Sequence, residues 1–155
     1  MSGMAQPAAQ FFAAADQALA QGDLAGAAGL IESALAQEDR GPEGWLKLAG
    51  LRRALRQPRK ALDAVHGALR HSPLDFIALC LRAGLLEKLD PSRAGEAWAE
   101  ALAQRPEGEV PAGMAGVIAA GEGWRDRWET QREARLQIPT MPPTYSDLIA
   151  PTVPI

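Results

Sequence analysis

Small and apolar residues recur along this chain in a fixed order, with a period of about 34 residues that shortens by one in the last copy. Each copy has a large residue, a small residue four positions later, and then an alanine-rich run built around one bulkier apolar residue. In the middle copy these positions are Trp45, Leu48, Ala49, Ala61, Val65 and Ala68, and Pro73 closes the copy. Self-similarity at a period of about 20 to 50 residues is typical of repeat architectures, so this pattern decides the expected fold class.

The two flanking copies keep the same positions with small departures. The first copy has Phe11, Ala14, Ala15, Ala27, Ile31 and Ala34. The third copy has Leu79, Arg82, Ala83, Ala94, Trp98 and Ala101, followed by Pro106. Arg82 stands where an apolar residue is expected, and one residue is missing at the turn near Asp90-Pro91. A deletion at a turn is easily tolerated, so the third copy still fits the repeat.

Helical periodicity and turn residues divide each copy into two helices. Ala27, Ile31, Ala34 and Leu35 have the i, i+4, i+7, i+8 spacing of one buried helix face. Breaks at Gly22-Asp23, Gly41-Pro42, Gln57-Pro58, Ser72-Pro73 and Asp90-Pro91 separate the segments. We therefore predict helices over residues 7–21, 24–37, 43–56, 59–71, 74–89 and 92–104, with Asp23 as the cap of the second. A seventh helix is predicted over residues 111–136.

The repeat resembles the tetratricopeptide repeat, in which a large residue, a small one, an Ala-x3-aromatic helix and a closing proline recur with a period of about 34 residues. The resemblance implies an all-α solenoid of three helix hairpins, over about residues 8–41, 42–74 and 75–107. The helix 111–136 is expected to cap the last hairpin, since an uncapped solenoid exposes its apolar side. Residues 1–136 would form this repeat domain, and residues 137–155 an extended proline-rich tail.

One stretch has a narrower resemblance. The runs GWLKLAGLRRALRQPRKALDAVHGALRHSP and LCLRAGLLEKLDPSRAGEAWAEAL resemble the N-terminal repeat module of bacterial aspartyl/asparaginyl β-hydroxylase-like proteins, over about residues 11–136. In that family the module precedes an iron and 2-oxoglutarate dependent catalytic domain. The only histidines here are His66 and His71, so no catalytic residue can be carried over. The resemblance therefore implies only a module that positions a partner polypeptide.

Composition narrows the function classes. The net charge is −3, which does not favour binding to nucleic acid, because phosphate binding needs clustered lysine and arginine. A single cysteine cannot form an internal disulfide and fits a reducing compartment. We find no secretory signal pattern and no apolar run of the roughly 20 residues that span a bilayer. We expect a cytoplasmic protein without membrane insertion.

Catalytic and cofactor motifs are also absent from the sequence. His66 and His71 are five positions apart on one predicted helix and face different directions, so a shared metal is not expected. Cys80 is predicted to be a small packing residue. No phosphate-binding loop or nucleophile elbow occurs. We expect neither an enzyme nor a bound cofactor.

The inner face of such a solenoid, formed by the first helix of each hairpin, is the predicted peptide-binding groove. Stepping along the chain by one repeat length assigns to it Phe12, Asp16, Leu46, Gly50, Arg53, Cys80, Gly84, Glu87 and Lys88. The two glycines have two interpretations, close approach of a partner's backbone or tight packing between helices. Asp16 stands where the family's known clamp for a terminal carboxylate begins, and it would repel a carboxylate.

Two further segments are candidate contact surfaces. The most basic stretch is Arg52, Arg53, Arg56, Arg59 and Lys60, which is either a dock for an acidic partner or a solvated helix face. The tail after residue 136 has five prolines and many apolar residues, with Tyr145, Leu148, Ile149 and Val153 as predicted contacts. The tail is expected to lie on protein, in its own groove or on a neighbouring subunit. Its PPTY segment is also similar to ligands of WW domains.

Together these observations predict a non-enzymatic adaptor that holds another protein or peptide. Two alternatives stay open. The chain could present substrates to an iron and 2-oxoglutarate dependent hydroxylase carried by another domain or chain, or it could be a structural subunit anchored in a larger assembly by its tail.

Overall fold

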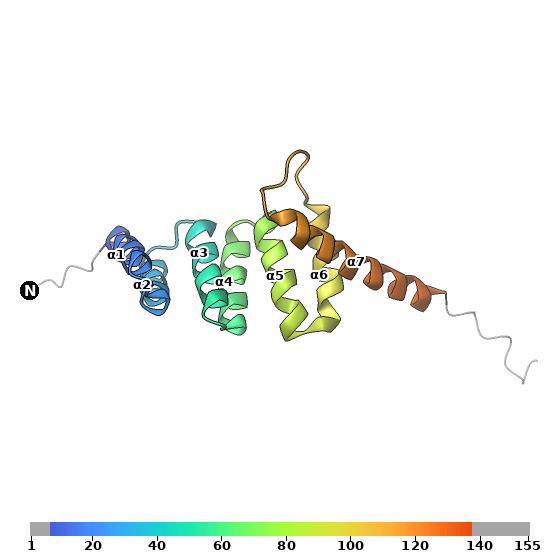
Figure 1. The fold of residues 1–155 in the computed structure, drawn as a ribbon, viewed down its shortest axis with the longest axis horizontal. Helices are drawn as coiled ribbons and strands as arrows, with labels where there is room; N and C mark the ends of the chain where they lie inside the picture. Colours follow the sequence, from blue (N-terminus) through green and yellow to red (C-terminus); the bar gives the residue numbers. More distant parts are fainter. Residues whose placement is uncertain (1–6, 138–155) are drawn as a thin grey trace, which may run out of the picture.

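The computed structural model describes residues 7–137, and within them the chain forms seven α-helices and no strand. The helices follow one another as three antiparallel hairpins and a final single helix (Figure 1). Their bounds are α1 (Ala8–Ala20) and α2 (Leu24–Gln37), α3 (Pro42–Ala54) and α4 (Pro58–His71), α5 (Phe76–Leu89) and α6 (Pro91–Ala103), and α7 (Met114–Leu136). Each hairpin packs against the next, so the described chain is an α-solenoid.

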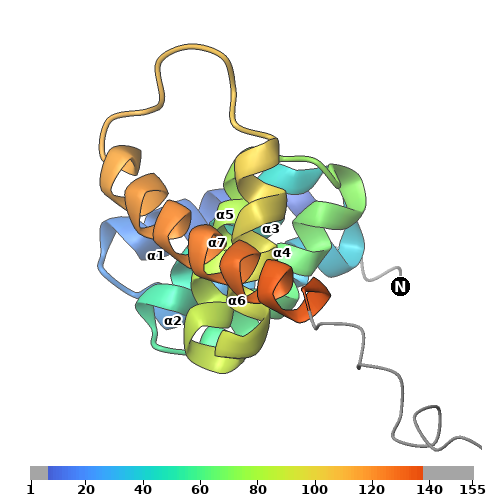
Figure 2. The ribbon, with the colours of Figure 1, turned by 90° about the vertical axis from the view of Figure 1, so that its right-hand side faces the viewer.

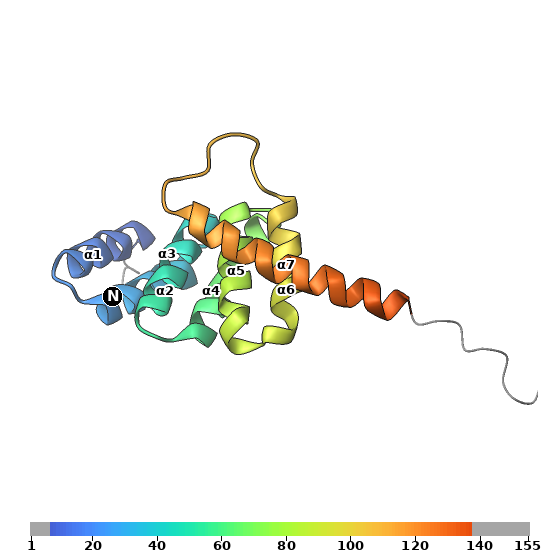
Figure 3. The same cartoon turned by 45° about the vertical axis from the view of Figure 1, so that its right-hand side comes forward.

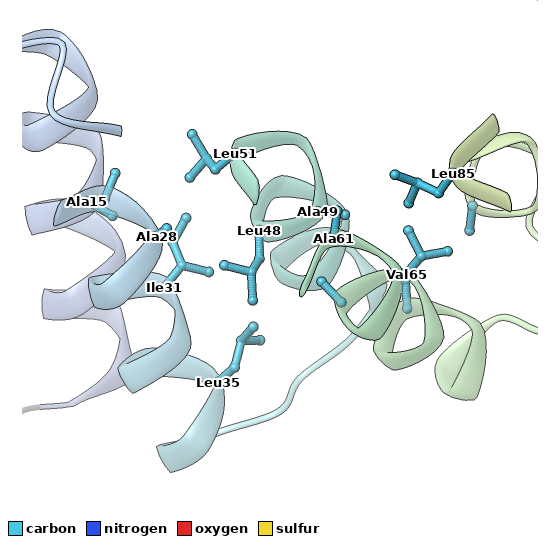
Figure 4. Close-up of a cluster of buried hydrophobic side chains, with 14 residues drawn as sticks. Ala15, Ala28, Ile31, Leu35, Leu48, Ala49, Leu51, Ala61, Val65 and Leu85 are labelled. Carbon is cyan, nitrogen blue, oxygen red and sulfur yellow. The ribbon is translucent and has the colours of Figure 1, made fainter. Parts of the chain in front are cut away.

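The alanine-rich second helix of each hairpin forms the centre of the core. The positions that the repeat assigned to these helices are all buried, with Ile31, Val65 and Trp98 as the largest fully buried side chains. Alanine fills the remaining positions and allows the helices to approach closely. Figure 4 shows how Ala28 and Ile31 of α2, Leu48 of α3 and Val65 of α4 continue one apolar layer from hairpin to hairpin.

Local signals set where most helices begin. The carboxylate of Asp23 accepts a hydrogen bond from the amide of Gly26 at 2.9 Å, which confirms Asp23 as the cap of α2. Asp75 caps α5 in the same way, through the amide of Ala78 at 2.7 Å. Because Asp75 is the cap, α5 begins at Phe76 and not at residue 74 as expected. Prolines stand at the first position of α3, α4 and α6, where a missing amide proton has no cost.

The last helix begins later than the sequence indicated. Gly113 has a φ of +92°, a left-handed conformation that interrupts helical backbone, so α7 starts at Met114 and not near residue 111. The first half of α7 packs against α6 and buries Ile118 and Gly121, and Figure 2 shows α7 lying across this end of the molecule. Trp128, in its second half, still packs against Gly95 of α6, and the last turns extend past α6 (Figure 1, Figure 3). The helix thus covers the outer side of the last hairpin, as the expected capping helix does.

Polar contacts link elements across the hairpin junctions. Asp39, in the loop between the first two hairpins, accepts hydrogen bonds from Nε1 of Trp45 at 2.7 Å and from the His71 ring at 2.6 Å. Arg52 is 9% exposed and pairs with Glu32 of α2, and its guanidinium also donates to Gln57 at 2.8 Å. Arg52 therefore stabilises a hairpin junction and does not belong to an exposed basic patch.

Candidate functional site

An open groove of about 800 Å³ lies along α5. Its walls come from the end of α3, the start of α4, the length of α5 and the first turns of α7. The beginning of α7, which Figure 3 shows in front of α5, contributes Met114 and Val117 to the lining. We call this cavity the α5 groove.

The floor and one wall of the α5 groove are apolar. Ile77 and Leu81 of α5 line the cavity together with Met114 and Val117 of α7. Ile77 is 38% exposed and Val117 45% exposed, so both leave apolar surface in water. Exposed apolar side chains that gather in a concavity are a feature of protein-binding sites.

The rim of the α5 groove is basic. Arg53, Arg56 and Lys88 line it, all three side chains are exposed, and no described Asp or Glu lines the cavity. None of the three forms an ion pair within the described residues, whereas Lys47, Arg82 and Arg105 each pair with a carboxylate. The groove therefore concentrates unneutralised positive charge in a chain whose net charge is −3.

Arg56 has an unusual backbone. Its φ is +58°, and it is the only residue other than glycine with positive φ in residues 7–137. The amide of Arg56 donates to the carbonyl of Arg53 at 3.0 Å, and the amide of Gln57 to the carbonyl of Arg52 at 2.9 Å, which closes α3 with a left-handed turn. One repeat length earlier, Gly22 makes the same turn with a φ of +77°. Arginine thus occupies a position that the first hairpin gives to glycine.

Gly84, also in the groove, leaves space on its open side. A Cβ built on Gly84 or on Gly50 would meet no described atom within 4 Å. Tight packing between the described helices therefore does not explain either glycine. Gly67 and Gly121 differ, because a Cβ there would lie closer than 3.0 Å to the indole rings of Trp45 and Trp98.

The groove brings together four of the nine residues expected to line it. These are Arg53, Cys80, Gly84 and Lys88. Cys80 is 4% exposed, and burial, with a smaller contribution from the charge of Asp75, raises the pKa of its thiol to about 11. The thiol is therefore protonated at neutral pH and contributes a small wall surface.

The other five expected residues lie elsewhere. Phe12 borders a second, smaller cavity of about 270 Å³ near the start of α3. Asp16 pairs with Lys47, and Leu46 packs against the core of the first two hairpins. Gly50 does not line the α5 groove. Glu87 does not line the α5 groove either, and its carboxylate accepts a hydrogen bond from Nε1 of Trp98 of α6 at 2.7 Å.

Sequence reasoning missed the apolar wall, and it named Arg56 only as part of the basic stretch and not as a groove residue. Met114 and Val117 lie after a non-repeating loop, so no step of one repeat length could place them. Arg56 had a usable signal, since it follows Gly22 by one repeat length at a helix end. Arg59 and Lys60 from the same basic stretch do not line the groove. The expected tail contacts Tyr145, Leu148, Ile149 and Val153 lie outside the described residues.

Three further features of the described residues bear on function. Within residues 7–137, no three His, Cys, Asp or Glu side chains cluster as metal ligands would. Burial, followed by the charge of Arg82, lowers the pKa of His66 from its ordinary value. None of the seven described helices combines the length and the apolar character that crossing a membrane requires.

Solved structures with the same arrangement of helices are tetratricopeptide-repeat domains. The TPR domain of Sgt2 from Aspergillus fumigatus superposes with a TM-score of 0.61 at 20% identity, over 81% of this chain and 82% of that one. The first TPR of Spaghetti (RPAP3) has a TM-score of 0.62 at 13% identity, over 80% and 94%. The Yersinia enterocolitica type III secretion chaperone SycD has a TM-score of 0.62 at 12% identity, over 79% and 92%.

The chain has the tetratricopeptide-repeat fold. This confirms the expected fold class of three helix hairpins followed by a capping helix. No protein-family model and no curated protein sequence matches the chain. At identities this low, the likeness establishes the fold and not a shared ligand. A function for this chain therefore has to be inferred from the chemistry of its own residues.

Proposed function

We propose that this chain is a non-enzymatic protein-interaction scaffold that holds a segment of a partner polypeptide in the α5 groove. The observation that carries the proposal is the groove itself, an open cavity with exposed apolar walls and basic side chains that no other described residue engages. A cavity of about 800 Å³ has room for several side chains of an extended or helical segment.

Two of the similar structures support a polypeptide ligand. The TPR of Spaghetti (RPAP3) is bound to an HSP90 peptide, SRMEEVD, and SycD is in complex with a peptide of the translocator YopD. Both superpose on this chain over about four fifths of its length. Binding of a protein segment is thus a use to which this arrangement of helices is suited.

Gly84 offers a direct test, because it lines the groove and a Cβ built there would point into open space. Random dodecapeptides displayed on phage would be selected on the wild-type chain, on Gly84→Trp and on Gly50→Trp. Gly50 is a matched control, since its open side is equally free but it does not line the groove. Circular dichroism would confirm that both variants fold.

We expect the wild-type chain and Gly50→Trp to enrich the same peptides, and Gly84→Trp to lose them. Enrichment of the same peptides on all three proteins would place binding outside the α5 groove. The absence of any enriched peptide would contradict the scaffold function. The two alternatives predicted from the sequence, association with a peptidyl hydroxylase and a structural subunit anchored by its tail, stay predictions.

A further inference from the structure

We propose that the α5 groove selects partner segments in which acidic side chains lie next to apolar ones. This inference rests on the proposed scaffold function and names the chemistry of its ligand. Arg53, Arg56 and Lys88 would bind the carboxylates, and the wall formed by Ile77, Met114 and Val117 would take the apolar side chains.

The charge distribution supports an acidic partner. Three exposed cations line the cavity and no described carboxylate does, although acidic residues outnumber basic ones, 19 to 16, over the whole chain. Glu87, one position before Lys88, is turned away and engaged by Trp98. A neutral or basic segment would leave these cations without partners, whereas an acidic one neutralises them.

Helix electrostatics explain part of this pattern but not all of it. Arg53 and Lys88 lie in the last turns of α3 and α5, where the helix dipole stabilises cations. Arg56 lies beyond the end of α3, in a left-handed conformation that disfavours side chains with a Cβ. Its side chain forms no hydrogen bond or ion pair within residues 7–137.

The strained turn therefore supports a binding function for Arg56. Gly22 forms the equivalent turn without strain, so nothing in the local fold requires arginine at position 56. A strained residue without structural partners points to a function outside the fold. A guanidinium also matches a carboxylate through two parallel hydrogen bonds, which suits it to this contact.

The first experiment uses the composition of the dodecapeptides selected on the wild-type chain. We expect Asp or Glu next to Leu, Ile, Val, Met or Phe in the peptides that Gly84→Trp loses. Peptides that are lost by Gly84→Trp but lack acidic residues would overturn this inference and leave the scaffold function intact. For an acidic selected peptide, replacing Asp and Glu by Asn and Gln should weaken binding at least about tenfold.

The second experiment separates the function of Arg56 from its strain. With the selected peptide as a fluorescent probe, Arg56→Gly should weaken binding about tenfold while raising the melting temperature by about 2 to 4 °C. Arg56→Lys keeps the charge and the backbone strain but loses the two parallel hydrogen bonds, so it should leave the melting temperature nearly unchanged and weaken binding less than Arg56→Gly does. Arg59→Ala is the matched control, because Arg59 is exposed in the same basic stretch but does not line the groove.

Two results would contradict the proposal. One is an Arg56→Gly variant that becomes more stable and binds the acidic peptide unchanged, since Arg56 would then have no part in recognition. The other is a peptide of residues 138–155 that displaces the selected probe and binds more tightly than it does. The groove would then belong to the chain's own tail and not to an acidic partner.

Discussion

The indole Nε1 of Trp98 donates a hydrogen bond to the carboxylate of Glu87 across 2.7 Å. Trp98 is the bulkiest core residue of the third hairpin and is 1% exposed, so its only polar side-chain atom has to find a partner inside the protein. The bond fixes α6 against the end of α5, and the ring also lies against Gly121 of α7. This contact withdraws Glu87 from the α5 groove and leaves the groove positive.

Removing the carboxylate of Glu87 should destabilise the chain without harming the groove. Glu87→Leu leaves the buried indole N–H unsatisfied and should lower the free energy of unfolding by about 1 to 3 kcal/mol. Glu87→Gln keeps an acceptor oxygen and should lower it less. Urea denaturation followed by circular dichroism measures both. Equal losses for the two variants would show that the hydrogen bond has no part in the effect.

Gly121 and Gly116 lie on the same helix and should respond oppositely to alanine. A Cβ at Gly121 would lie closer than 3.0 Å to the Trp98 ring, whereas one at Gly116 would meet no described atom within 4 Å. Gly121→Ala should therefore cost about 1 to 3 kcal/mol of stability through overpacking. Gly116→Ala should add about 1 kcal/mol through better helix propensity. Thermal unfolding of both variants checks the sign of each effect, and a stabilised Gly121→Ala would contradict the packing of α7 on α6.

The link between Asp39, Trp45 and His71 should make stability fall in acid. Burial raises the pKa of the Asp39 carboxyl, but the hydrogen bonds from Trp45 and His71 and the nearby positive charges outweigh it, so the pKa lies below the ordinary 3.8. A carboxyl whose pKa is lower in the folded chain than in the unfolded chain stabilises the fold at any pH above its unfolded-state pKa. This contribution is lost as the pH falls through its folded-state pKa.

The measurement is the melting temperature of wild type and Asp39→Asn between about pH 6 and pH 2.5. Wild type should be the more stable at pH 6, and the difference should shrink below about pH 4. A difference that stays constant over this range would show that the Asp39 charge does not contribute to stability.

Cys80 should be unreactive in the folded chain. Its thiol is buried, and its pKa of about 11 leaves almost no thiolate at pH 8. Ellman's reagent should therefore modify Cys80 slowly under native conditions and rapidly in about 6 M guanidinium chloride, where the burial is removed. Rapid native modification would mean that the wall of the α5 groove opens at Cys80.

Some expected groove residues could be found by the repeat and others could not. One repeat length relates Arg53 to position 87, and both positions are at the end of a first helix. Arg53 nevertheless lines the groove while Glu87 turns toward α6, because the second helix of the third hairpin carries a tryptophan whose buried indole N–H needs an acceptor. Side chains that depend on a partner from another helix cannot be placed by counting along one helix.

The sequence by itself determined the helices, their pairing into hairpins and their buried alanine faces. These features depend on 3.6-residue periodicity, on prolines and capping aspartates at turns, and on contacts between neighbours in the chain. Tertiary structure alone decided where α7 lies and which cations gather around the α5 groove. After α6 the repeat ends, and the path of the chain depends on the turn at Gly113, on the fit of Gly121 to Trp98 and on the apolar face of α7. These contacts bring Val117 to the same groove as Ile77, although the two residues are far apart in the sequence.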